Sequence, residues 1–150
     1  MKAQEFLQQL KKLDKIIENK LVEKGQWKNI ATRTTVQLGK EKVQTSANPQ
    51  TMESAVVRFV DIETEIDVYI DKLIDVKQDV ISVIEQLNAR EYDLLHKLYV
   101  QFYTMQEVVE LYGNSMSWAK GIHRSGLRKV QKILDERECV QKCPNLSKSN

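Results

Sequence analysis

Apolar residues recur at helical spacing along the first part of the chain. Five of them stand three or four positions apart, which places them on one face of a helix: Phe6, Leu10, Leu13, Ile17 and Leu21. The stripe weakens around Gly25, because a glycine inside a helix costs about 1 kcal/mol relative to alanine, and apolar residues from Trp27 onward restore it. The pattern predicts one long helix over residues 2–38, with two shorter helices as the alternative.

A linker and a second long helix follow. Residues 39–50 are typical of a linker, since Gly39 can end a helix and Pro49 cannot continue one in its interior. Residues 51–87 contain no Gly or Pro and predict a helix roughly 55 Å long. Its predicted seam consists of Phe59, Ile66, Ile70, Leu73, Val80, Ile84 and Leu87. The similar lengths of the two helices predict a long antiparallel helical hairpin, a coiled coil, over residues 1–87.

A second apolar stripe accompanies this seam and consists of Ile62, Tyr69, Val76 and Val83. A two-helix hairpin needs only one narrow apolar face, whereas a wider face is typical of a bundle. We therefore expect a homodimer formed through residues 1–87. The alternative is that the C-terminal part of the same chain folds back over the extra face.

Charge is distributed in blocks rather than evenly. Residues 1–50 carry a net charge of +5, residues 51–87 of −6 and residues 88–150 of +3, although the whole chain carries only +2. The basic first helix therefore suits the acidic second one. Exposed ion pairs contribute only about 0–1 kcal/mol each, so charge should select the pairing while apolar burial stabilises it.

Short elements with clear capping signals make up the rest of the pattern. Asn88 and Glu91 form a candidate capping box at the start of a short helix, whose apolar positions are Leu94, Leu95, Leu98 and Phe102. Thr104 is suited to cap the next helix, over residues 104–112. Gly113 permits a sharp turn, and Ser115 can cap the helix that follows.

That last helix is basic, and no acidic residue occurs between Ser115 and Lys132. Ala119, Ile122, Leu127 and Val130 fall mostly on one face, whereas the basic residues point elsewhere: Lys120, Arg124, Arg128, Lys129 and Lys132. A helix, a turn with glycine and a second, basic helix form the layout of a helix-turn-helix motif, whose second helix enters the major groove. We predict a DNA-binding domain over residues 88–134 and a frayed tail over residues 135–150.

Three segments resemble the fourth region of bacterial sigma factors, whose terminal helix-turn-helix reads promoter DNA: REYDLLHKLYV, TMQEVVELYG and SMSWAKGIHRSGLRKV. Together with the helical hairpin, the layout is similar to that of small proteins from Gram-positive phages, prophages and integrative elements, of the ArpU late-gene regulator type. The resemblance covers residues 3–134. It implies an all-α protein that regulates transcription of phage or mobile-element genes, with double-stranded DNA as its partner.

The resemblance also implies which residues contact DNA. Base-reading positions fall on Met116, Ser117, Lys120 and Gly121, and phosphate-contacting positions on Arg124, Arg128 and Lys129. Among these residues, Lys120 is best suited to reach guanine acceptors. Ser115 and Trp118 complete the predicted DNA-binding set. The indole of Trp118 either packs against the first helix of the motif or lies along the sugar-phosphate backbone.

A rival hypothesis keeps the hairpin but removes DNA readout. Sigma factors carry long polar residues where this chain has Met116 and Gly121, and this difference favours a coiled-coil factor that binds RNA polymerase or another host protein. In the DNA-binding hypothesis the hairpin serves either dimerisation or contact with RNA polymerase.

The sequence offers no sign of other chemistry. No phosphate-binding glycine loop or catalytic triad is visible, so we expect no enzymatic activity and no cofactor. Cys139 and Cys143 lack the further ligands of a zinc site, so we expect no metal. His123 is expected at the surface or close to the backbone. No apolar run approaches the roughly 20 residues of a membrane span, and a cytoplasmic location without membrane contact is expected.

Overall fold

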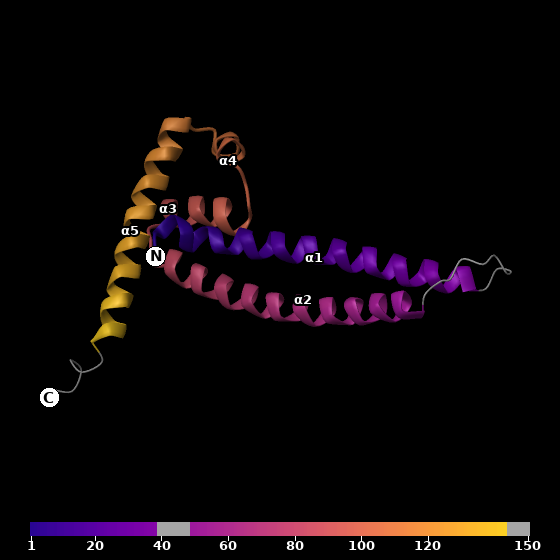
Figure 1. Ribbon diagram of the computed structural model, residues 1–150. Coiled ribbons are helices and arrows are strands. Elements are labelled where there is room, and N and C mark those ends of the chain that lie inside the picture. Colours follow the sequence, from indigo (N-terminus) through magenta and orange to yellow (C-terminus); the bar gives the residue numbers. More distant parts are fainter. Residues whose placement is uncertain (39–48, 144–150) are drawn as a thin grey trace. The chain divides into compact units, whose positions relative to one another are not determined.

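The computed structural model describes residues 1–38 and 49–143. The described chain is all-α, as predicted, and contains no strand. Its elements are α1 (Ala3–Leu38), α2 (Pro49–Ile84), α3 (Ala89–Leu95), the π-helix η1 (His96–Val100), α4 (Met105–Tyr112) and α5 (Met116–Lys142) (Figure 1). The chain divides into two compact units. We call Met1–Lys12 with Asp75–Asn150 the head unit, and Leu13–Ile74 the hairpin unit.

The two long helices differ from the prediction mainly at their ends. Helix α1 is continuous through Gly25, so the alternative of two shorter helices is wrong. Helix α2 begins at Pro49, inside the predicted linker, because a proline in the first turn needs no hydrogen-bonded N–H. The rest of that linker, residues 39–48, lies outside the described residues. Helix α2 ends at Ile84, three residues earlier than predicted.

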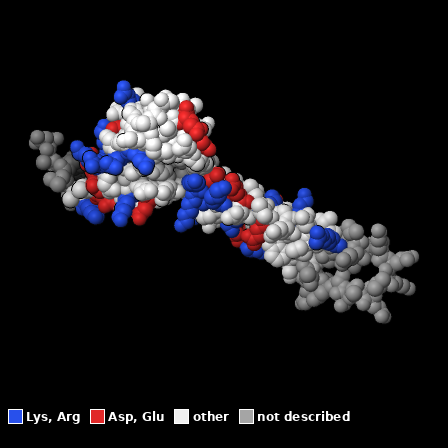
Figure 2. All heavy atoms as spheres, turned by 90° about the horizontal axis from the view of Figure 1, so that it is seen from above, with Lys and Arg blue, Asp and Glu red and all other residues white. Residues whose placement is uncertain are grey.

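Within the hairpin unit, α1 and α2 run antiparallel (Figure 1). Lys20 pairs with Glu65 at 2.6 Å and Lys24 with Glu63 at 2.9 Å, so the partner number on α2 falls as the number on α1 rises. Figure 2 shows Lys and Arg side chains interspersed with Asp and Glu along this unit. The sequence blocks of opposite charge therefore meet across the hairpin.

The α2 seam combines the two apolar stripes that the sequence suggested. Its buried and half-buried positions follow one seven-residue repeat, at Ala55, Phe59, Ile62, Ile66, Tyr69 and Leu73. The predicted seam and the predicted second stripe are thus alternate positions of a single coiled-coil face. The separate stripe proposed from Ile62 and Tyr69 does not exist, and Ile70, placed on the seam by the sequence, is 39% exposed.

Two lysines occupy seam positions of α1. The repeat that begins at Phe6 reaches Lys20 and Lys24, and Leu21 is 50% exposed, contrary to the prediction. The Lys20 ammonium lies 5.4 Å from the centre of the Tyr69 ring. The Lys24 ammonium lies 5.3 Å from the centre of the Phe59 ring. Such cation–π contacts let the seam accept a charged head group.

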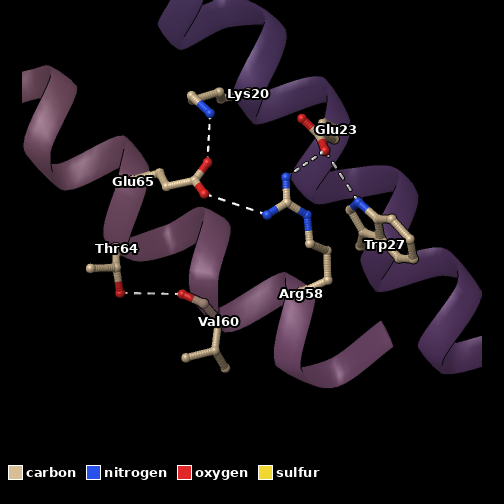
Figure 3. A network of polar contacts seen from close by, with 7 residues as sticks. All are labelled: Lys20, Glu23, Trp27, Arg58, Val60, Thr64 and Glu65. Atoms are coloured by element: carbon tan, nitrogen blue, oxygen red, sulfur yellow. Dashed lines mark hydrogen bonds and ion pairs between the residues drawn. The ribbon is translucent and has the colours of Figure 1, made fainter. Parts of the chain in front are cut away.

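Lys20 belongs to a polar network that joins α1 to α2 (Figure 3). The Arg58 guanidinium reaches both Glu23, at 3.3 Å, and Glu65, at 3.4 Å. The Trp27 indole N–H donates to the same Glu23 carboxylate. The hydrogen bond between Lys20 and Glu65 raises the pKa of the lysine and lowers that of the glutamate. The network fixes the register of the two helices.

The head unit contains a buried apolar core. Its buried residues come from both ends of the chain and from the middle: Ala3, Phe6, Leu7, Val80, Val83, Ile84, Leu95, Val130 and Leu134. The first turns of α1 and the last turns of α2 thus share a core with α3 and α5. The compact units consequently do not divide at residue 87, where the sequence suggested a boundary.

Helix α5 is longer than predicted, because residues 135–142 continue it instead of forming a frayed tail. Polar contacts along α5 hold this extension. The Ala3 N–H donates to the Gln131 side chain at 2.7 Å, and Arg137 pairs with Asp79 at 2.8 Å. The last residues of the predicted tail, 144–150, lie outside the described part of the chain.

Candidate nucleic-acid interface

The connection between α4 and α5 is built from the residues that the sequence indicated. Thr104 and Glu107 form a reciprocal capping box at the start of α4. Gly113 ends that helix with φ of 65°, a left-handed conformation that glycine adopts without strain. The Ser115 hydroxyl accepts the Trp118 N–H at 3.2 Å and caps α5. These local contacts fix the direction in which α5 leaves the turn.

The outward side of α5 carries a line of cations. Lys120, Arg124, Arg128 and Lys132 follow one another at intervals of four residues and are all exposed. The line is about 18 Å long at the usual helical rise. None of the four forms an ion pair with any residue that the structure describes. Their charges are therefore available to a polyanion.

Two other residues of the predicted DNA-binding set lie on the outward side of α5, and Lys132 adds a cation that the set does not include. Ser117 and Gly121 are exposed beside Lys120. Lys132 lies outside the predicted DNA-binding set, although its four-residue interval from Arg128 places it in the same line.

Lys129 has a different environment from its basic neighbours. Its ammonium lies 2.9 Å from a carboxylate oxygen of Glu91, whose side chain is only 5% exposed. The Ser125 hydroxyl donates to the same carboxylate at 2.6 Å. Burial by itself would raise the pKa of Glu91, but the hydrogen bonds from Ser125 and Lys129, with the lysine charge, hold it below its usual value. Lys129 thus fastens α5 to α3.

The inward side of α5 depends on a close approach to α3. Ala119, Gly126 and Val130 are buried. A Cβ added at Gly126 would lie 3.0 Å from a methyl carbon of Leu95, so a larger residue there would require the Leu95 side chain to shift. Gly121 faces open space. The two glycines of α5 therefore differ in their surroundings, since only Gly126 lies close to another helix.

Trp118 packs inward rather than pointing away from the domain. Its ring meets that of Tyr112, the last residue of α4, edge to face with 5.8 Å between centres. Of the two alternatives left by the sequence, packing against the first helix of the motif therefore holds. Met116 is likewise half-buried. Both residues position the start of α5, which leaves Ser117, Lys120 and Gly121 as the exposed residues of its first turns.

A pocket of about 450 Å³ adjoins the start of α5. It is lined by Ala89, Arg90, Asp93, Tyr112, Asn114 and Trp118. The Arg90 side chain is exposed and, like the cation line, has no ion-pair partner among the described residues. Arg90 and Trp118 line the same pocket only because the fold brings α3 and α5 together, which local sequence patterns do not reveal.

His123 is half-buried, so part of its side chain reaches the surface while its ring packs against η1. Its Nε2 lies 2.7 Å from the Tyr99 hydroxyl, and the two rings stack with 5.8 Å between centres. Burial lowers the pKa of His123. Tyr99 belongs to η1, which replaces the end of the predicted helix, and Phe102 follows it with φ of 63°.

The described residues show no metal site. Cys139 and Cys143 are exposed free thiols, and the described residues include no group of three or more His, Cys, Asp or Glu that could hold a metal ion. Within residues 1–38 and 49–143, no helix is long and apolar enough to cross a membrane.

Comparison with known proteins yields no relative. No protein-family model matches the chain, and neither a curated protein nor a solved structure matches it significantly. A functional assignment must therefore be argued from the side chains of α5 and their surroundings.

Proposed function

We propose that the chain is a DNA-binding transcription regulator of phage or mobile-element genes, and that α5 enters the major groove. The cation line of α5 is the observation that carries the proposal. Four exposed cations at regular intervals, with no acidic partner among the described residues, suit a row of phosphates better than they suit a solvated protein surface.

The roles of the individual residues follow from their positions. Lys120, with Ser117 beside it, lies in the first turns of α5, where a recognition helix reaches base edges. Lys120 donates to guanine acceptors, and Ser117 adapts to either donor or acceptor. Arg124, Arg128 and Lys132 neutralise phosphates farther along the helix. Lys129 contributes mainly to the stability of the domain.

The hairpin then serves protein contact, either with a second copy of the chain or with RNA polymerase. The resemblance in layout to small sigma-region-four-like regulators supports the link to phage and mobile-element transcription. It also favours a cytoplasmic protein.

The test is a titration of labelled duplex DNA by fluorescence anisotropy at several salt concentrations. Each lost phosphate contact should reduce the slope of log K against log salt by about 0.9. The charge reversal Lys120→Glu with Arg124→Glu should therefore weaken binding strongly and flatten the salt dependence. The matched control is Lys11→Glu with Lys12→Glu, which removes the same charge from two exposed residues of α1.

The two double variants separate specific from general effects. Equal loss of affinity in both would mean that only net charge matters, and would refute the assignment of α5 as the contact surface. Unchanged affinity after Lys120→Glu with Arg124→Glu would refute it as well. Circular dichroism of each variant establishes that the helices remain folded.

A further inference from the structure

Helix α2 carries a second line of residues beside its seam, here called the flank stripe. It follows the seven-residue repeat of the seam at intervals of four and three, and consists of Val56, Val60, Glu63, Asp67, Ile70 and Ile74. The stripe is about 27 Å long at the usual helical rise and lies entirely within the hairpin unit. Helix α2 therefore has one face covered by α1 and, beside it, a second face with the same spacing that is mostly exposed to solvent.

The apolar members of the flank stripe are unusually exposed. Val56, Val60, Ile70 and Ile74 have exposed fractions of 45%, 51%, 39% and 49%. A pocket of about 420 Å³ with mainly apolar walls adjoins the Val56 end and is lined by Lys28, Ala31, Thr32, Met52, Val56 and Phe59. Exposed apolar surface at coiled-coil spacing is typical of a site that another helix covers.

The centre of the flank stripe is acidic. Glu63 pairs with Lys24, but Asp67 and the adjacent Asp71 are exposed and have no ion pair within the described part of the chain. The stripe thus presents an apolar pair, then carboxylates, then another apolar pair. This order of apolar and acidic residues determines which helices can pack on the stripe.

A second copy of α2 does not fit this order. In an antiparallel two-fold pairing that matches the apolar pairs, Glu63 faces Asp67 of the second copy, and in a parallel pairing each acidic residue faces itself. Like charges facing each other across an interface are strongly unfavourable. A shift by one repeat does not help, because it places carboxylates against Ile70 and Ile74.

We propose that the flank stripe binds an amphipathic helix of another protein whose apolar residues flank a basic centre. Lys or Arg at that centre pairs with Asp67 and Asp71, while the apolar residues at its two ends cover Val56, Val60, Ile70 and Ile74. This inference is independent of DNA binding by α5. It assigns the hairpin to contact with a different protein rather than to self-association.

The test uses three labelled helical peptides of the same length. Each carries four leucines at the spacing of the flank stripe, and the two central positions are both Lys, both Ala or both Glu. We expect the Lys peptide to bind the full chain best and the Glu peptide at least about tenfold more weakly, as measured by anisotropy at physiological salt.

Variants of the chain locate the interaction. Asp67→Lys with Asp71→Lys should reverse the order of the peptides, and Ile70→Ser with Ile74→Ser should weaken all three by about tenfold or more. The control Asp61→Lys with Asp75→Lys makes the same charge change on α2 outside the stripe, and should leave the order unchanged.

Two outcomes would overturn the proposal. One is that no peptide binds, or that the affinity does not depend on the charge at the central positions of the peptide. The same holds if Asp67→Lys with Asp71→Lys leaves the order of the peptides unchanged. The other is that the chain sediments as a dimer that Ile70→Ser with Ile74→Ser dissociates, since a second copy would then occupy the stripe. Loss of DNA binding in the α5 variants would change neither result, so the two proposals fail separately.

Discussion

Replacement of Lys129 by methionine tests whether this lysine holds the domain together. The change keeps much of the aliphatic stem but removes the charge that faces Glu91, 2.9 Å away. Glu91 is 5% exposed and cannot recover full hydration, whereas the Lys129 side chain is 50% exposed. Loss of one partner leaves a nearly buried carboxylate without its counter-charge.

The expected loss of stability lies between the values for a fully buried and a fully exposed ion pair. Breaking a buried ion pair costs about 3–5 kcal/mol, whereas an exposed pair contributes about 0–1 kcal/mol. Lys129 is half-exposed, and Ser125 still donates to the carboxylate, so we expect a loss of about 2 kcal/mol in the free energy of unfolding. The control Lys132→Met removes a cation without a described partner, and should change stability by less than about 0.5 kcal/mol.

The assay is urea unfolding followed by Trp118 fluorescence in a Trp27→Phe background. Trp118 belongs to the head unit and Trp27 to the hairpin unit, so the signal reports the unit that contains the ion pair. A double-mutant cycle with Glu91→Gln isolates the pair itself. Lys129→Met should lower the free energy of unfolding much less in the Glu91→Gln background, where residue 91 is neutral.

The pH dependence gives a second measure of the same interaction. Because the folded pKa of Glu91 is lowered, its stabilising contribution is complete above the pKa of an unfolded glutamate, about 4.3, and is lost as pH falls through the folded pKa. The effect of Lys129→Met should shrink in that range. Equal stability of the Lys129→Met and Lys132→Met variants at neutral pH would refute this reasoning, and Lys129 would then be available to DNA like its neighbours.

Three further predictions concern the head unit. The Tyr112 hydroxyl is buried without a hydrogen-bond partner in the described structure, so Tyr112→Phe should raise the free energy of unfolding by up to about 1 kcal/mol; a loss in thermal melts would contradict this. Gly121→Ala should stabilise α5 by about 0.5–1 kcal/mol, whereas Gly126→Ala, which meets Leu95, should destabilise it; equal shifts in melting temperature would argue against the close approach. Burial lowers the pKa of His123 and His96, so unfolding free energy should fall as pH drops below about 6.5; a pH profile of the His123→Gln variant should lack its share of that fall.

Local signals in the sequence predicted the local structure well. The caps at Asn88, Thr104 and Ser115 and the turn at Gly113 all appear where the side-chain chemistry placed them. Each depends on atoms within about four residues of one another. The all-α class followed from the same kind of information.

Features that depend on distant residues were harder to predict. Periodicity alone did not show that the two apolar stripes of α2 form one seam, because the sequence does not reveal which residues of α1 face α2. The seam position of Lys20 was missed since lysine is normally exposed, and only the Tyr69 ring and Glu65 explain it. The role of Lys129 required Glu91, which lies 38 positions away.

The shared core of the head unit has a consequence for how the chain reaches its folded state. Ala3 bonds to Gln131, 128 positions later, and Phe6 and Leu7 join a cluster with Val130 and Leu134. During synthesis, Phe6 and Leu7 therefore lack their partners from α5 until that helix has left the ribosome. Contacts between residues so far apart in sequence tend to slow folding, and a nascent chain stalled before α5 would leave these apolar side chains exposed to chaperones.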